Sequence, residues 1–154
     1  MLRSHRYKIF AAVIAASLAT SAAIADDIKL TRAEPSIVDV SMTNKQDGQQ
    51  IMVLSQNPVR AGPVLFKVKN ESPNSVHEFL VLKTDLDPSS FPMTDDGARV
   101  DEAKLGGIKE LGSDLEPGKS GQMQMILSPG HYVLFCNQPG HFMAGMFATL
   151  RVTP

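Results

Sequence analysis

The residues best suited to chemistry in this chain lie close together near its C-terminal end. Cys136, the single cysteine, is followed by His141 and Met146, with four residues between each pair. A thiolate, an imidazole and a thioether therefore share one short segment, and His77 offers a second imidazole from far upstream. Two imidazoles and one thiolate in a trigonal plane, with a weak axial thioether, form the ligand set of a blue-copper electron-transfer site.

The elements predicted around these residues can bring them together. Residues 132–136 predict a strand that delivers the cysteine to one end of a sheet. Residues 137–140, Asn-Gln-Pro-Gly, favour a turn that folds the chain back, so that His141 faces the same point. Gly145 gives the backbone freedom before the methionine, and His77 begins a separate predicted strand. Three donors from one loop and one from a distant strand would form a rigid clamp.

Each of these residues alone has an ordinary explanation. A single buried cysteine is usually a small core side chain, and a methionine at the start of a strand usually packs in the core. The combination favours a metal site because the donors are scarce: beyond residue 25 the only histidines are His77, His131 and His141. His131 lies five residues before Cys136, about 16 Å along an extended chain, and we interpret it as a structural or surface residue.

The segment Cys136-x4-His141-x4-Met146, with Pro-Gly before the histidine and Gly before the methionine, resembles the cupredoxins, the blue or type 1 copper proteins. Its spacing is most similar to that of the rusticyanin- and sulfocyanin-like members. The segment from His77 to Asp85 also resembles proteins described only as cupredoxin-like copper-binding proteins. The resemblance extends over residues 26–154, and it implies one type 1 copper ion with His77, Cys136, His141 and Met146 as ligands.

One residue departs from the cupredoxin pattern. Many cupredoxins carry Asn or Ser after the first histidine ligand, where this chain has Glu78. In those relatives that side chain ties the two ligand segments together by hydrogen bonds. We expect Glu78 and Asn137 to share this task here, since partners of this kind orient the ligands and tune the metal.

Short apolar or alternating runs, separated by turn residues, predict the fold. The predicted strands cover residues 28–42, 50–55, 64–70, 77–83, 122–127, 132–136 and 146–152. This pattern predicts an all-β, Greek-key antiparallel β-sandwich of cupredoxin type. Residues 84–113 are rich in Asp, Pro and Gly and are too long for a hairpin loop, so they predict an excursion from the sandwich, with a short helix around residues 100–105.

The N-terminal residues have the pattern of a secretory signal. Residues 1–8 are basic, residues 9–24 are apolar and rich in alanine, and Ala23-Ile24-Ala25 predicts cleavage after Ala25. An uncleaved anchor is the alternative, but the run is shorter than the roughly 20 residues that a span needs. We therefore expect residues 26–154 to form one domain of an exported, soluble, periplasmic monomer that has no membrane span after cleavage.

The charge of the predicted mature chain is acidic and local. Three of the fifteen Lys and Arg residues lie in residues 1–25, which leaves twelve against sixteen Asp and Glu, a charge of −4. Residues 85–116 hold nine of those acids and three bases. No basic patch indicates a nucleic-acid partner. The acidic stretch predicts long-range steering of a basic partner from outside the metal site; a merely solvated loop is the alternative.

The candidate site indicates a carrier rather than an enzyme. Catalytic copper needs an open coordination position or a second copper, and this chain has too few histidines and cysteines for further centres. No serine lies in a nucleophile-elbow sequence either. The leading hypothesis is a one-electron carrier whose redox partner, a cytochrome or an oxidase, docks near His141. The expected docking rim is apolar and consists of Pro139, Phe142, Met143 and Ala144.

Two other functions stay open at the level of sequence. One is copper handling, in which the protein buffers the metal, delivers it or confers tolerance. Met123 and Met125, on one face of a predicted strand, would suit a Cu(I) site for that task, although core or surface packing is the simpler explanation. The other is a subunit of a larger respiratory complex.

Overall fold

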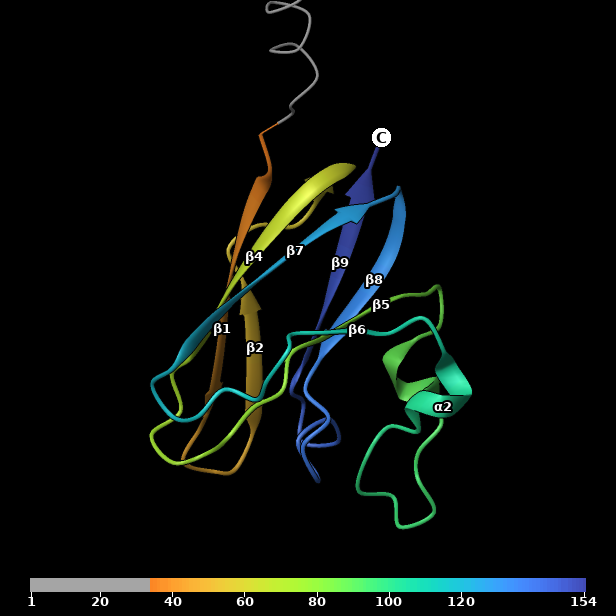
Figure 1. Cartoon of the computed structure of the whole chain (residues 1–154). Coiled ribbons are helices and arrows are strands. Elements are labelled where there is room, and N and C mark those ends of the chain that lie inside the picture. Colours follow the sequence, from red (N-terminus) through yellow and green to blue (C-terminus); the bar gives the residue numbers. More distant parts are fainter. Residues whose placement is uncertain (1–33) are drawn as a thin grey trace, which may run out of the picture. The chain divides into compact units, whose positions relative to one another are not determined.

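The computed structural model describes residues 34–154, which form a sandwich of two β-sheets (Figure 1). The first sheet has the strand order β2-β1-β4-β7, made of β1 (Ser36–Asn44), β2 (Gln50–Leu54), β4 (Gly62–Asn70) and β7 (Ser120–Leu127). The second has the order β3-β9-β8-β5-β6, made of β3 (Val59–Arg60), β5 (Leu80–Lys83), β6 (Lys109–Glu110), β8 (Gly130–Phe135) and β9 (Phe147–Thr153). The predicted signal peptide, residues 1–25, lies outside the described residues. Within residues 34–154 no helix is long and apolar enough to cross a membrane.

The sandwich prediction is confirmed, but the sheets are mixed rather than wholly antiparallel. β1 pairs in parallel with β4, and β3 pairs in parallel with β9, whereas the other pairs are antiparallel. The cause is the path of the chain after β2. It crosses to the second sheet as β3 and returns to the first as β4, so β4 enters in the direction of β1.

Alternation along the strands of the first sheet directs one face of each into the core. In β4, Val64, Phe66 and Val68 are at most 1% exposed, while Lys67 and Lys69 between and after them face solvent. Strands with one buried and one wetted face show this period of two. Met123 and Met125, on β7, also point inward and pack against this core.

The excursion between β5 and β7 is a packed layer on the outside of the second sheet. It contains a 3-10 turn (Pro88–Ser90), the helix α2 (Glu102–Leu105), as predicted, and β6. Two of its side chains, Phe91 and Val100, are buried against that sheet and against Phe142 of the C-terminal loop. We call this second cluster the outer core; its buried members are Leu80, Leu82, Phe91, Val100, Val133, Phe135 and Phe142.

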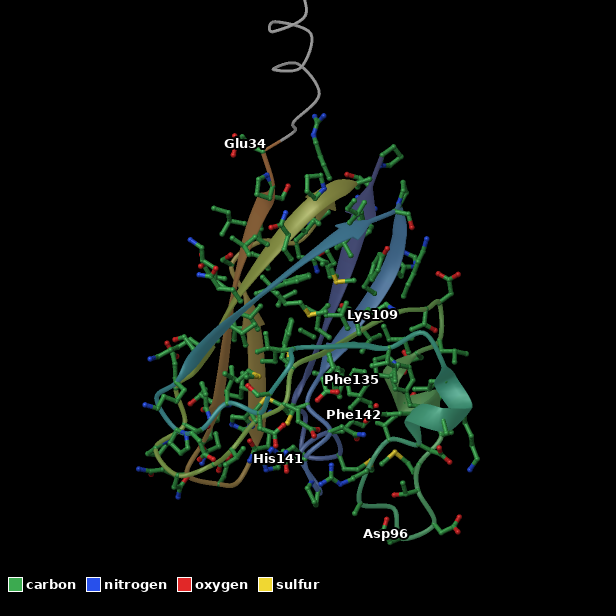
Figure 2. All side chains as sticks on the ribbon, viewed as in Figure 1. Glu34, Asp96, Lys109, Phe135, His141 and Phe142 are labelled. Atoms are coloured by element: carbon green, nitrogen blue, oxygen red, sulfur yellow. The ribbon has the colours of Figure 1, made fainter. Side chains whose placement is uncertain are left out.

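Aromatic rings join the excursion to the C-terminal loop. The rings of Phe91 and Phe142 stack with their centroids 5.5 Å apart and their planes 7° from parallel. Phe135 of β8 meets both edge-on, at 5.9 and 5.7 Å. Figure 2 shows Phe135 and Phe142 on the same side of the second sheet as the excursion. The excursion therefore supports the loop that follows β8.

The turn between β7 and β8 is tied by a buried tyrosine. Tyr132 is 4% exposed, and its hydroxyl donates a hydrogen bond of 2.9 Å to the carbonyl oxygen of Ser128. The hydroxyl oxygen of Tyr132 in turn accepts a bond of 3.1 Å from the N–H of Ser128. Tyr132 is the one tyrosine among residues 34–154, and its ring belongs to the inner core of the sandwich.

Candidate metal centre

Three of the predicted ligands meet at the end of the sandwich where Figure 2 labels His141. The Nδ1 atoms of His77 and His141 are 3.1 Å apart. Cys136 Sγ lies 3.5 Å from Nδ1 of His141 and 3.8 Å from Nδ1 of His77. The point equidistant from the corners of this triangle is about 2.0 Å from each atom, close to the roughly 2.0–2.3 Å of bonds from Zn²⁺ to imidazole nitrogen and thiolate sulfur. The three donors are therefore spaced to hold one small transition-metal ion.

Burial prepares these side chains to act as ligands. His77 and Cys136 are fully buried, and His141 is half-buried. Burial, followed by the nearby His141, lowers the pKa of His77 to about 4. The pKa of His141 is also lowered, by burial and then by the charge of Arg99. Both imidazoles are therefore neutral near pH 7, which is the state that binds metal.

The pKa of the Cys136 thiol shifts in the opposite direction from the pKa values of the two histidines. Burial raises the pKa of Cys136 to about 11, so without a nearby positive charge the sulfur keeps its proton at neutral pH. A bound metal cation supplies that charge and deprotonates a coordinating thiol. In this buried site the thiolate form of Cys136 is therefore favoured only when a metal cation is bound beside it.

The loop that carries three of the predicted ligands is closed by its own backbone. Cys136, which directly follows β8, donates its N–H to the carbonyl of Met146 at 3.0 Å, and Met146 donates its N–H to the carbonyl of His141 at 3.0 Å. Gly145 adopts a φ of +100°, and a Cβ there would lie 3.1 Å from the carbonyl oxygen of Gln50. This close approach requires glycine. Met146 is fully buried and lies beside Cys136 along the backbone.

His77, the predicted ligand outside this loop, is held by Leu115 and Ser72, which no sequence pattern indicated. His77 lies outside any strand, which corrects the predicted strand over 77–83; its backbone exchanges hydrogen bonds of 3.1 and 2.8 Å with Leu115. Its Nε2 is 2.7 Å from the hydroxyl of Ser72, which is 2% exposed. With Nδ1 turned to the site, Nε2 carries the proton and donates to Ser72. Such bonds fix the tautomer and ring orientation of a metal ligand.

Glu78 and Asn137, the two residues expected to tie the ligand segments together, make different contacts. The side chain of Asn137 binds the excursion: its Oδ1 accepts from Val100 N–H at 2.7 Å, and its Nδ2 donates to Val100 O at 3.1 Å and to Glu102 Oε1 at 2.7 Å. Glu78 contributes its backbone, whose N–H donates to Cys136 Sγ at 3.3 Å. The acidic excursion therefore contacts the residue that follows Cys136, while none of its own residues belongs to the donor triangle.

The remaining candidates, His131 and the predicted apolar rim, differ in their exposure to solvent. His131 is exposed and 3.1 Å from Asp85 Oδ1, which confirms the surface interpretation. Of the predicted apolar rim, Met143 is 67% exposed and Pro139 is also exposed. Phe142 is only 5% exposed and belongs to the outer core, but it also lines an apolar groove together with Met143.

Comparison with known proteins supports the fold. No protein-family model and no curated protein sequence matches this chain. Auracyanin from Roseiflexus castenholzii superposes with a TM-score of 0.53 at 17% identity, covering 80% of this chain and all of the other. Auracyanin B gives 0.53 at 22% identity over 80% and 94%, and rusticyanin from Thiobacillus ferrooxidans gives 0.50 at 15% over 78% and 79%. Residues 34–154 therefore have the cupredoxin β-sandwich fold, as predicted.

Proposed function

We propose that this protein is a type 1 copper protein that carries single electrons between redox partners. The observation that carries the proposal is the triangle of two Nδ1 atoms and one Sγ, with sides of 3.1, 3.5 and 3.8 Å. The donor set is the one that blue-copper sites use. A similar fold occurs in rusticyanin, which is described as a copper protein, and in an auracyanin studied in its dithionite-reduced state. Bound copper would supply one-electron chemistry by cycling between Cu(II) and Cu(I).

Each residue then has a distinct role. His77, Cys136 and His141 would hold the copper, and Met146 would offer a weaker sulfur donor. Because the loop is closed by backbone bonds and His77 is held by Ser72, the donors keep their places when the charge of the metal changes. The bound copper would accept one electron from a reduced partner and pass it to an oxidised one. His141 is the only half-buried member of the triangle, so we assign electron exit to its edge.

The first prediction concerns metal binding. Metal-free protein is expected to bind one equivalent of Cu(II) and to become intensely coloured, since a short copper–thiolate bond gives strong charge-transfer absorption. A reductant should bleach the colour and an oxidant should restore it. The titration uses protein recovered from the periplasm, which begins at Asp26 after the proposed cleavage. Absorption spectroscopy follows copper binding, and a redox titration measures the reduction potential.

Zinc is the matched control for that titration. It should bind to the same ligands without colour and should compete with copper, because the donors suit both metals. A protein that takes up Cu(II) without strong visible absorption, or that loses copper on each reduction, would contradict the proposed carrier function. Loss of copper on reduction would instead favour copper delivery.

The alternative function, copper delivery, was suggested by a possible Cu(I) site at Met123 and Met125. Met123 and Met125 lie on the inner face of β7 and pack against the core between the sheets. The exposed residues of β7 that alternate with them are Gln122, Gln124 and Ile126. A solvent-facing Cu(I) site on this strand therefore has no sulfur ligands to use.

We further propose that the redox partner docks on an apolar groove beside the ligand loop. The groove is lined by side chains from the excursion, from the loop and from β9, including Phe91, Met93, Met143 and Phe147. Asp87 lies in its wall, and the excursion that forms one side holds most of the local acidic charge. An apolar surface with an acidic border fits a basic redox protein, such as a cytochrome, that presents an apolar patch of its own.

The second prediction tests this charge complementarity. Changing Asp85, Asp95 and Asp96 together to Asn should slow electron exchange with cytochrome c, a basic haem protein, by about three- to tenfold at low ionic strength. The copper spectrum should not change, because none of the three contacts a proposed ligand. The difference should vanish in high salt, where charges are screened within a few Å. Stopped-flow absorbance measures the rate.

Glu34→Gln is the control, because Glu34 lies at the end of the sandwich far from His141 (Figure 2). It should have less effect for each charge removed. Rates that are indifferent to both ionic strength and the three substitutions would assign recognition to apolar contacts alone.

A further inference from the structure

A partly buried carboxyl group, that of Glu78, lies directly beside the proposed copper site. Glu78 follows His77 in the chain, and its N–H donates to Cys136 Sγ. Its side chain is only 16% exposed, and Oε2 is buried without a hydrogen-bond partner. A buried charge is costly unless another group compensates it. A cation close by would offset this cost.

Arg99 is that cation, and it comes from the excursion. Its Nη1 lies 3.8 Å from Glu78 Oε1 and donates a hydrogen bond of 2.7 Å to the carbonyl oxygen of Asn137. One guanidinium thus contacts the residue after His77 and the residue after Cys136. Arg99 therefore links the segment that carries His77 to the loop that carries the other predicted ligands.

Other charges around Glu78 increase its dependence on Arg99. Carboxylate oxygens of Glu110 and Asp114 lie within 4.8 Å of the Glu78 carboxylate and of each other. Asp114 accepts a bond of 2.8 Å from the side chain of Gln138 in the ligand loop. Among the ion pairs of residues 34–154, Arg99 is the only base paired with Glu78.

We propose that Arg99 is a positioning residue that joins the two ligand segments, compensates Glu78 and thereby sets the reduction potential of the copper centre. This inference rests on the proposed function. The oxidised centre carries one more positive charge than the reduced centre. A neighbouring cation therefore favours Cu(I), and a neighbouring carboxylate favours Cu(II). Arg99 and Glu78 should act on the potential in opposite directions.

The test is a double-mutant cycle on the full, copper-loaded protein. Arg99→Gln should lower the potential, so that the ratio of Cu(I) to Cu(II) at a fixed applied potential falls by about three- to tenfold. Glu78→Gln should raise that ratio by a similar factor. Because the two side chains form a pair, the effects in the double variant should differ from their sum. Spectroelectrochemistry measures the potential, and electron paramagnetic resonance reports the geometry of the site.

Two further variants separate charge from structure. Arg99→Lys keeps the charge but replaces the planar guanidinium, so the potential should remain near that of the parent while the spectrum changes. Arg151→Gln removes an exposed arginine whose backbone, on β9, bonds to Asn57, and it should leave the potential unchanged. A purely structural role for Arg99 predicts lower stability in the Gln variant with an unaltered potential.

The outcomes distinguish the inference from the function on which it rests. If the parent protein is coloured and redox-active but Arg99→Gln and Glu78→Gln shift the potential in the same direction, or not at all, the inference is overturned and the proposed function stands. If the parent protein binds copper without colour, the proposed function itself fails.

Discussion

Replacing Cys136 with serine is expected to remove the visible absorption of the copper-loaded protein completely. Sγ forms two sides of the donor triangle, and a serine hydroxyl neither ionises readily nor gives the same charge-transfer band. Loss of one in-plane ligand should also weaken copper binding by at least about 100-fold, since changes in the partners of metal ligands alone cost about 10- to 100-fold. Absorption spectroscopy and competition with a copper chelator measure the two effects.

Met146→Leu is the matched control for that variant, because Met146 is as fully buried as Cys136. A weak axial ligand tunes the potential rather than holding the metal. The leucine variant should therefore keep its copper and its colour, with a shifted band and an altered potential. A coloured serine variant would refute the site, whereas a leucine variant identical to the parent would show that the methionine sulfur is only a packing group.

Replacing Phe142 with alanine is expected to lower the free energy of unfolding by about 3–5 kcal/mol. The ring is 5% exposed and is enclosed by Phe91 and Phe135 in the outer core. Its removal leaves a cavity between the excursion and the second sheet, where rigid rings cannot collapse to fill the space. Denaturant-induced unfolding of the metal-free protein measures the change, so that copper binding does not contribute.

The neighbouring residue provides the comparison. Met143 is 67% exposed, and Met143→Ala should change the free energy of unfolding by no more than about 0.5 kcal/mol. Similar small effects for both variants would mean that the excursion is not held by the outer core. In that case the support that it gives to Asn137 would have to come from hydrogen bonds alone.

Much of the candidate site could be predicted because its chemistry is local. The spacing from Cys136 to Met146 and the turn residues between them determine where the loop can place His141. The scarcity of histidine then left His77 as the natural fourth member. The structure confirms that His77, Cys136 and His141 come together.

The partners of these residues could not be predicted, because they depend on contacts between distant segments. No pattern marks Ser72 as the partner of a histidine five residues later, or Arg99 as a link between two ligand segments. The parallel pairing of β1 with β4 is hidden for the same reason: alternation shows which face of a strand is buried but not the direction of its neighbour.

One signal in the sequence did indicate the outer core. Residues 79–82 and 132–135 are continuous apolar runs, unlike the alternating run in β4. Such runs are typical of strands covered on both faces. In the structure both runs are buried throughout, because the excursion packs on the outside of β5 and β8. The excursion was therefore predictable as a covering layer, although its individual contacts were not.

Tyr132 provides a natural fluorescence signal for the folding of residues 34–154. The chain contains no tryptophan, and Tyr132 is the one tyrosine of residues 34–154. Its ring is buried, and its hydroxyl is bonded to the turn between the two sheets. The tyrosine fluorescence of these residues therefore arises from a single ring, which becomes exposed when the inner core opens. Refolding of the metal-free protein can be followed at this point without a label.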